Sequence, residues 1–273
     1  MKATMKSAWT LTRQHFPLIL FLFLYRFIIG FILYRFIDNI VVPILHRYPS
    51  GAPIEHAQQI FLTEAQFQLT KTNMIMPYLC TLVAIIAVRM LITPFIHSGL
   101  FHSIQRQIQQ VKGTRFREGI RTHWKKVSAI YWLGVITMIV PAIWLLPILA
   151  QKLTTALTVG QLLTEIGPWL VGWGIYALAI HLFSVALQVG IVAQRKVVTI
   201  LQRTVSSFIP YLILSVLLWV IGIGVNSLFS TTTLLWAGFA ALVIHQISQL
   251  VTTWMKVWTL TAQSHFLLHK LEQ

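Results

Sequence analysis

Six long apolar stretches constrain this chain more than any other feature. They run over residues 16–45, 76–101, 128–149, 167–193, 207–228 and 234–260. A helix needs about 20 mostly apolar residues to cross about 30 Å of hydrocarbon, and each stretch is long enough. Only 10% of the residues are charged, against about 25% in an ordinary soluble domain. The sequence therefore predicts an all-α fold, a polytopic membrane helical bundle of six transmembrane helices. We expect residues 1–273 to form a single integral membrane domain.

The Lys and Arg residues fall unevenly between these stretches. Fourteen of them would lie on the side that holds both termini, and only Arg47, Lys71 and Lys152 on the other. Since the Lys- and Arg-rich side of a membrane protein stays in the cytoplasm, we expect cytoplasmic N- and C-termini. The formal net charge of +15 could indicate nucleic acid in a soluble protein. Here the basic residues lie between apolar runs, so membrane phospholipids are the expected anionic partner, with no nucleic acid.

The segment 102–126 carries half of these basic residues and predicts an amphipathic cytoplasmic helix, broken at Lys112-Gly113. Its apolar residues, Ile104 and Trp124 among them, would face the membrane. Its basic side chains would hold the cytoplasmic leaflet, each contributing about 1 kcal/mol near an anionic surface. The candidate lipid-phosphate residues here are Arg115, Arg117, Arg121, Lys125 and Lys126.

A threefold internal repeat is suggested by three similar stretches. They begin at residues 7, 119 and 200, and each precedes an odd-numbered transmembrane stretch. In each, one apolar residue precedes another by seven positions: Trp9 and Phe16, Ile120 and Val127, Leu201 and Phe208. Such a period is typical of repeat architectures. We expect three units, of about 1–101, 102–193 and 194–273, each a short interfacial helix followed by a transmembrane hairpin.

Each even-numbered stretch also carries an Ile-His pair, with the histidines His97, His181 and His245. Convergent histidines could form a polar or metal-binding centre. Alternatively, each is hydrogen-bonded within the bundle or lies at an interface, which is the interpretation that we favour. No Cys/His spacing resembles a zinc site, and the single cysteine, Cys80, is expected to be a buried, inert thiol.

Arginines inside the apolar stretches are costly and need compensation. A central arginine costs at least about 2.5–3.5 kcal/mol on insertion scales. Arg35 has Asp38 three residues on, the spacing of a helical ion pair. Arg26 and Arg89 have no acidic residue in the transmembrane stretches to pair with. A bound phosphate could offset their cost; snorkelling or capping by free carbonyls is the alternative.

Enzymatic motifs are missing from the sequence. It contains no Gly-rich phosphate loop, no His-Glu-x-x-His zinc motif and no Gly-x-Ser-x-Gly elbow. Its six acidic residues are scattered along the chain, which does not favour a carboxylate pair or a metal cage. We therefore expect no catalytic residues, no metal site and no cofactor.

Three segments of the sequence are informative as motifs. They are Trp-Thr-Leu-Thr-Arg-Gln-His-Phe-Pro from residue 9, Leu-Thr-Lys-Thr-Asn-Met-Ile-Met-Pro from residue 69, and Pro-Ile-Leu-Ala-Gln-Lys-Leu-Thr from residue 147 ahead of Ile-Gly-Pro-Trp from residue 166. Together they resemble the membrane domain found ahead of some bacterial glycerophosphodiester phosphodiesterases. In that family a separate soluble barrel, with a His-Arg-Gly start and acidic metal ligands, carries the catalysis. Here His46-Arg47 is followed by Tyr48. The resemblance thus implies a membrane domain without catalytic residues, close to glycerophospholipids of a bacterial envelope.

Together these features predict a non-enzymatic protein of the bacterial cytoplasmic membrane that engages anionic phospholipid headgroups. A transporter or permease subunit is one alternative, supported by prolines within helices at Pro94, Pro141 and Pro210. A scaffold whose basic cytoplasmic face docks a separately encoded soluble enzyme is another. The sequence does not indicate an oligomeric state.

Overall fold

A computed structural model describes residues 2–45, 63, 67, 76–109, 115–155, 158–235 and 239–272. All regular secondary structure in these residues is helical. The helices are α1 (Lys2–Gln14), α2 (Phe16–Leu45), α4 (Met76–Ile108), α5 (Phe116–Thr155), α6 (Val159–Val192), α7 (Val197–Ser206), α8 (Phe208–Leu235) and α9 (Phe239–Glu272). Five of these helices, α2, α4, α5, α6 and α8, contain segments long and apolar enough to cross a membrane. The fold is therefore that of a multi-pass helical membrane protein.

The helix boundaries agree with the apolar stretches in some places and differ in others. The first stretch coincides with α2, and α9 covers most of the sixth, although α9 is not among the five helices that qualify as spans. Residues 102–108 and 116–126 are helical, as predicted, but they do not form a helix of their own. Residues up to Ile108 continue α4, and residues from Phe116 continue without a break into the apolar part of α5. The predicted break at Lys112-Gly113 lies outside the described residues.

The chain divides into two compact units. The first unit comprises Met1–Ile29, Thr93–Tyr131 and Leu182–Gln273, and the second comprises Gly30–Ile92 and Trp132–His181. Helices α2, α4, α5 and α6 each contribute one part to the first unit and the other to the second.

Two apolar clusters form the core of the first unit. The larger one joins α2, α4 and α9 through Leu18, Ile19, Leu22, Leu100, Ile104 and Val257. Ile104 is fully buried there, so the prediction that it faces lipid is wrong: its side of α4 packs against protein. The smaller cluster joins α1, α8 and α9 through Ala8, Leu214, Leu218 and Ala262.

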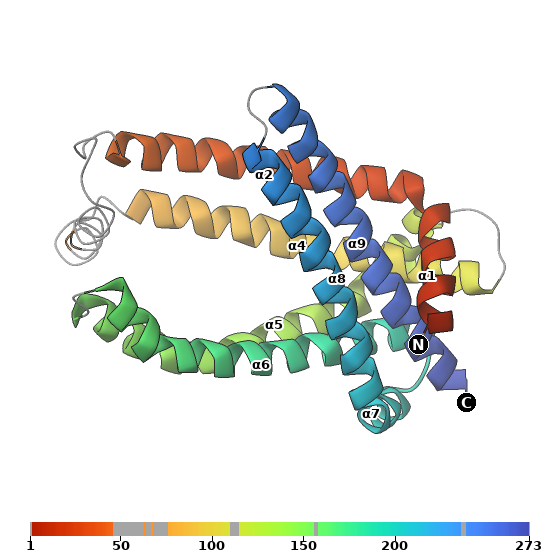
Figure 1. Ribbon diagram of the computed structural model, residues 1–273. Coiled ribbons are helices and arrows are strands. Elements are labelled where there is room, and N and C mark those ends of the chain that lie inside the picture. The colour runs from red at the N-terminus through yellow and green to blue at the C-terminus, as the bar shows by residue number, and fades with distance from the viewer. Residues whose placement is uncertain are drawn as a thin grey trace. The chain divides into compact units, whose positions relative to one another are not determined.

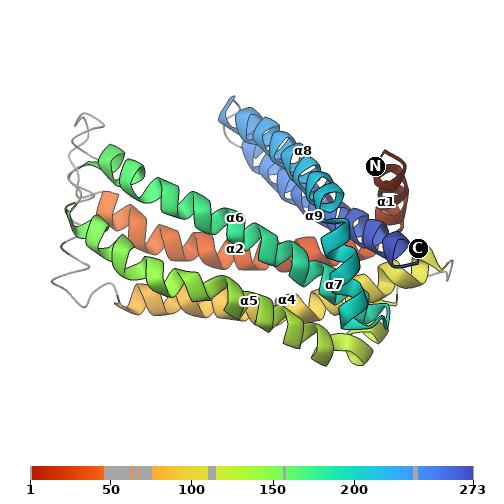
Figure 2. The same ribbon diagram turned by 90° about the horizontal axis from the view of Figure 1, so that it is seen from below.

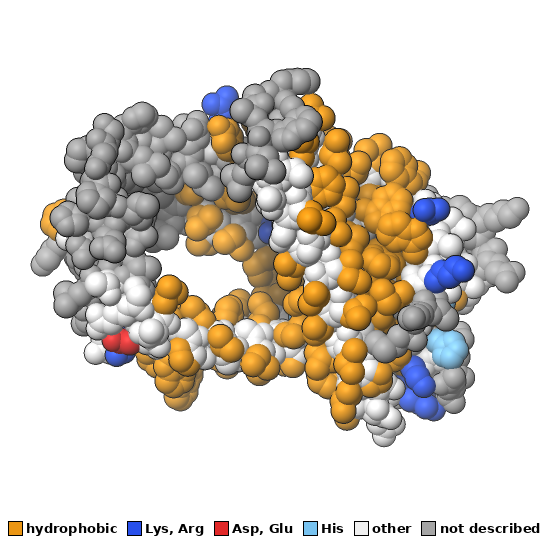
Figure 3. All heavy atoms as spheres, viewed as in Figure 1, with side chains coloured by type: hydrophobic (Ala, Val, Ile, Leu, Met, Phe, Trp, Pro, Cys, Tyr) orange, Lys and Arg blue, Asp and Glu red, His pale blue; other side chains and the backbone are white. Residues whose placement is uncertain are grey.

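Helices α8 and α9 lie side by side, and α1 packs on α9 (Figures 1 and 2). The indole of Trp258 on α9 donates a hydrogen bond of 3.2 Å to the carbonyl of Met5 on α1. Hydrophobic side chains cover much of the visible face of α8 and α9, while Lys and Arg side chains gather near α1 and the C-terminal end of α9 (Figure 3). Apolar side chains along the helices and basic side chains at one end are the expected pattern for a helix pair that extends from the hydrocarbon into water at that end.

Two tight turns redirect the chain at the entry to a membrane helix. Between α1 and α2, the amide of His15 donates to the carbonyl of Thr12 at 3.0 Å. Between α7 and α8, the amide of Ser207 donates to the carbonyl of Arg203 at 3.0 Å. A proline follows in the first turn of the next helix, Pro17 in α2 and Pro210 in α8, where its missing N–H removes no helical hydrogen bond.

His15 at the first of these turns is fully buried, and neither of its ring nitrogens has a hydrogen-bond partner among the described residues. Burial disfavours the charged imidazolium and lowers the pKa of His15 from 6.5 to about 4. The side chain is therefore neutral at physiological pH.

In the second unit, aromatic side chains of α6 donate hydrogen bonds to carbonyls of α5. The indole of Trp173 donates to Met138 at 3.1 Å, and the hydroxyl of Tyr176 donates to Thr137 at 3.0 Å. Toward the far end of this hairpin, Lys152 and Glu165 form an ion pair of 2.8 Å. Cys80, also in this unit, is exposed, so the prediction of a buried thiol is wrong. A cysteine in an apolar helix can face lipid as well as protein.

Candidate functional site

In the first unit, α4 and α5 cross at very close range through two glycines. A Cβ atom added at Gly119 would lie 2.5 Å from Cβ of His102 and 2.9 Å from the carbonyl oxygen of Ser98. A Cβ added at Gly99 would lie 2.5 Å from the ring of Phe116. Only residues without side chains fit such positions, and the crossing brings the polar residues of both helices together.

Two histidines meet beside this crossing. His102 on α4 and His123 on α5 have ring centroids 5.3 Å apart, inclined at 39°. They are only 5% and 7% exposed. Neither ring nitrogen of His102 has a hydrogen-bond partner among the described residues. A buried imidazole without partners is costly, since its N–H and its lone pair both lose their bonds to water.

The C-terminus of α6 approaches the same region and ends in a Schellman motif. The amide of Arg195 donates to the carbonyl of Gly190, and the amide of Gln194 to that of Ile191, both at 3.0 Å. Gln194 has a φ of 57°, a left-handed conformation that usually favours glycine. A non-glycine residue there is under backbone strain, of order 1 kcal/mol.

A cleft of about 270 Å³ lies between these three helices. Its lining includes His102 and Arg106 from α4, Gln109 just after α4, Glu118 and His123 from α5, and Gln194. A smaller cleft of about 110 Å³ shares Gln109 with it and adds Arg195. We call the larger space the histidine cleft.

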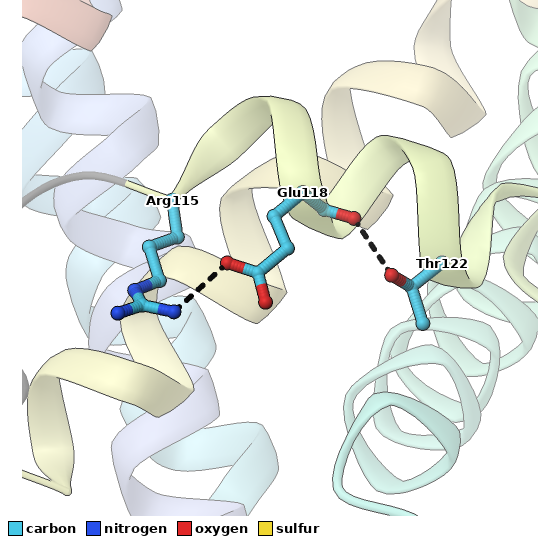
Figure 4. A network of polar contacts seen from close by, with 3 residues as sticks. All are labelled: Arg115, Glu118 and Thr122. Atoms are coloured by element: carbon cyan, nitrogen blue, oxygen red, sulfur yellow. Dashed lines mark hydrogen bonds and ion pairs between the residues drawn. The ribbon is translucent and has the colours of Figure 1, made fainter.

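The carboxylate of the histidine cleft is already paired. Glu118 accepts a hydrogen bond of 3.1 Å from the guanidinium of Arg115, just before α5, while its backbone carbonyl accepts one of 2.9 Å from the hydroxyl of Thr122 (Figure 4). In and around the two clefts there are thus three guanidinium groups, those of Arg106, Arg115 and Arg195, and the carboxylate of Glu118, which pairs with Arg115. The local charge is positive.

The exposed side of the same part of α5 carries the predicted basic residues. Arg117, Arg121 and Lys125 recur every four residues and are all exposed, so they form one stripe along the helix. We call these three residues the basic stripe. Arg115 and Lys126 are exposed as well.

Aromatic rings accompany the basic stripe. Trp124 stacks on Phe95 of α4 with ring centroids 5.5 Å apart, and the ammonium group of Lys125 lies 5.8 Å from the centre of the Trp124 ring. Tryptophan beside lysine and arginine is typical of the membrane–water interface.

The arginines inside the apolar helices lie in different surroundings. Arg26, in the first unit, is half-buried and donates a hydrogen bond of 3.2 Å to the hydroxyl of Thr253 on α9. Arg89 and Arg35 belong to the second unit and are exposed. The guanidinium of Arg35 lies 5.7 Å from the ring centre of Phe31, and the side chain of Asp38, its predicted partner, lies outside the described residues.

The histidines of the Ile-His pairs also differ. His97 forms a hydrogen bond of 2.8 Å with the amide oxygen of Gln188 on α6, whose amide nitrogen donates to Ser184. His181 and His245 are exposed, and His181 belongs to the second unit. Within the described ranges, no three His, Cys, Asp or Glu side chains gather as a metal ligand set would.

None of the residues that line the histidine cleft was predicted as a site residue. Arg115, which pairs with Glu118 beside the cleft, was predicted. His102 and His123 are not part of the repeated pairs, and Arg106 was one basic residue among several in its segment. The signal that could have found them is the pair of glycines, Gly99 and Gly119, each within a helix and close to a histidine. Comparisons with family models, curated proteins and solved structures found no match for this chain.

Proposed function

We propose that this chain is a non-enzymatic protein of a bacterial cytoplasmic membrane that engages anionic phospholipid headgroups. The observation that carries the proposal is the basic stripe, with its three cationic side chains exposed along one side of α5. Each contributes about 1 kcal/mol near an anionic leaflet, and together they favour an anionic over a neutral surface by roughly 100-fold. The stacked Trp124 supports an interfacial position for this segment.

The orientation and the repeats are part of the same proposal. The excess of Lys and Arg supports a cytoplasmic position for the basic stripe and both termini. The three-hairpin architecture is supported by positions that the proposed repeat aligns with one another. Two such sets are buried throughout: Ala8, Gly119 and Ile200, and then Thr12, His123 and Thr204. The resemblance to the membrane domain of glycerophosphodiester phosphodiesterases is consistent with a headgroup-binding role.

The experiment that tests the proposal measures which lipids accompany the full-length protein. The protein is extracted in polymer-bounded nanodiscs from membranes that contain phosphatidylglycerol and phosphatidylethanolamine, and the lipids are quantified by mass spectrometry. We expect phosphatidylglycerol to be enriched around the wild type. The variant Arg117→Gln/Arg121→Gln/Lys125→Gln should lose that enrichment.

A charge-conserving variant is the matched control. Arg117→Lys/Arg121→Lys/Lys125→Arg keeps three positive charges at the same positions, so it should retain the enrichment. Equal lipid composition around wild type and neutralised stripe would refute the proposal. A soluble acidic protein captured by the stripe in place of lipid would favour the scaffold function.

The arginines within the apolar helices need an experiment of their own, because they belong to α2 and α4 and not to the basic stripe on α5. We propose that Arg26 and Arg89 contact lipid phosphate. Neutralising both by Arg26→Gln/Arg89→Gln should then abolish the preferential retention of phosphatidylglycerol over phosphatidylethanolamine in native mass spectrometry. Retention in the double variant would assign them a structural role, as the hydrogen bond from Arg26 to Thr253 would suggest.

A further inference from the structure

The histidine cleft has the chemistry of an anion site rather than of a packing defect. It is lined by charged and amide side chains, and its volume of about 270 Å³ lies just below the range of about 300–1,000 Å³ that is usual for ligand pockets. A space of this size suits a small polar group better than a large organic ligand.

His102 is the feature that points most directly to a ligand. The side chain is 95% buried, it lines the cleft, and both ring nitrogens lack a hydrogen-bond partner among the described residues. A neutral imidazole can donate one hydrogen bond and accept another. A group that accepts a hydrogen bond within the cleft would satisfy the donor that the protein leaves unused.

The charges around the cleft select the sign of that group. Arg106 lines the cleft, and Lys126 contributes to the electrostatic field at His123. The carboxylate of Glu118 is neutralised by Arg115. Glu118 also lies in the first turn of α5, so the positive end of that helix dipole faces the same region.

We propose that the histidine cleft binds the phosphate group of a phosphate ester, held by Arg106 and by the imidazoles of His102 and His123. The guanidinium supplies paired hydrogen bonds to phosphate oxygens, and each imidazole supplies one donor. The proposal goes beyond the surface attraction of the basic stripe, because it assigns one phosphate to one cleft. It rests on the proposed function only if that phosphate belongs to a lipid.

A divalent metal is the competing occupant of two neighbouring histidines. The described residues offer no third ligand, the nearby carboxylate is paired with Arg115, and Arg106 would repel a cation. The structure thus favours an anion.

The test uses the full chain in detergent and in nanodiscs, with two phosphate probes. The first probe is inorganic phosphate, titrated against chloride at constant ionic strength, with thermal stability as the readout. The second is phosphatidylglycerol in nanodiscs, with a single retained lipid detected by native mass spectrometry. Stabilisation by inorganic phosphate would identify a site open to soluble phosphates, and retention of one phosphatidylglycerol alone would identify a headgroup site.

Two variants separate the cleft from the surface. Arg106→Gln and His102→Gln/His123→Gln should weaken binding of the effective probe by about tenfold or more, the loss expected for a charge-assisted hydrogen bond. Arg106→Lys should restore part of it. The neutralised basic stripe should leave binding in the cleft unchanged, so the failure of either proposal is visible without the other.

The proposal would be overturned if neither probe bound the wild type, or if the effective probe bound all cleft variants as well as the wild type. Stabilisation by zinc chloride that phosphate does not reproduce would also overturn it, in favour of a metal site. If the double histidine variant does not fold, Arg106→Gln decides, because Arg106 is partly exposed and contributes less to packing.

Discussion

The close crossing of α4 and α5 makes a sharp prediction about alanine substitutions. In Gly119→Ala the new methyl group would lie 2.5 Å from Cβ of His102, about 1 Å closer than the optimal separation of two carbon atoms. Neither contact can be relieved by rotating a flexible side chain, because the methyl group meets the first side-chain carbon of His102 and, at 2.9 Å, the backbone of Ser98. The helices must therefore separate.

The expected loss of stability follows from that separation. Overpacking of a core costs about 1–3 kcal/mol, while replacing a helical glycine by alanine gains about 1 kcal/mol in helix propensity. The control variant Gly222→Ala removes this second effect from the comparison, since Gly222 lies within α8 and a Cβ there would meet nothing within 4 Å. Relative to Gly222→Ala, we expect Gly119→Ala to lose about 1–3 kcal/mol.

Thermal unfolding in detergent measures the difference. A chain of this size shifts in Tm by about 2–4 °C for each kcal/mol, so Gly119→Ala should unfold roughly 2–12 °C below Gly222→Ala. Gly99→Ala should behave in the same way, because its methyl group would meet Phe116 at 2.5 Å. Equal Tm values for Gly99→Ala, Gly119→Ala and Gly222→Ala would refute the close crossing.

Three further predictions concern single polar side chains. The pKa of His15 is about 4 in the folded chain and about 6.5 in the unfolded chain, so the unfolded chain binds this proton first as pH falls. The free energy of unfolding should therefore decline between pH 6.5 and pH 4, by about 3 kcal/mol in total. Over this pH range the Tm of His15→Gln should fall less than that of the wild type. Gln188→Leu removes the amide that Nδ1 of His97 contacts at 2.8 Å. In chemical denaturation the free energy of unfolding should fall by about 1–3 kcal/mol. An unchanged free energy of unfolding would contradict the observed contact. Glu165→Gln breaks a partly exposed ion pair with Lys152. Such a pair contributes little, so the Tm should equal that of the wild type within error.

The membrane helices were predictable because each depends on local composition. The stretch over 16–45 coincides with α2. In lipid, a long apolar run is stable as a helix, because all of its backbone groups then form hydrogen bonds within the segment. The sixth stretch was harder to assign. Helix α9 carries buried polar side chains such as Ser248, Thr253 and Gln263, and these lower its mean hydropathy. Such side chains are tolerated because α9 packs against protein in the first unit.

The histidine cleft was not predictable, because its residues meet through tertiary packing. His102 and His123 lie in different helices and are 21 positions apart, and nothing in their local sequence indicates contact. Their proximity depends on the crossing at Gly99 and Gly119, and a glycine inside a helix has several explanations until its neighbour is known. The basic stripe, in contrast, follows from the helical period alone.

The basic stripe and the histidine cleft lie on one segment of α5, and the helical period keeps them apart. At 100° per residue, Arg121 and His123 point about 200° apart around the helix axis. The exposed stripe and the buried series Gly119, His123 and Val127 therefore occupy opposite sides of the same turns. The basic stripe, which we propose attracts anionic headgroups, thus lies within one helix diameter, about 10 Å, of the cleft that we propose binds a single phosphate. Because the two sides share no residue, neutralising one leaves the other intact, and attraction to the leaflet can be separated experimentally from capture of one phosphate.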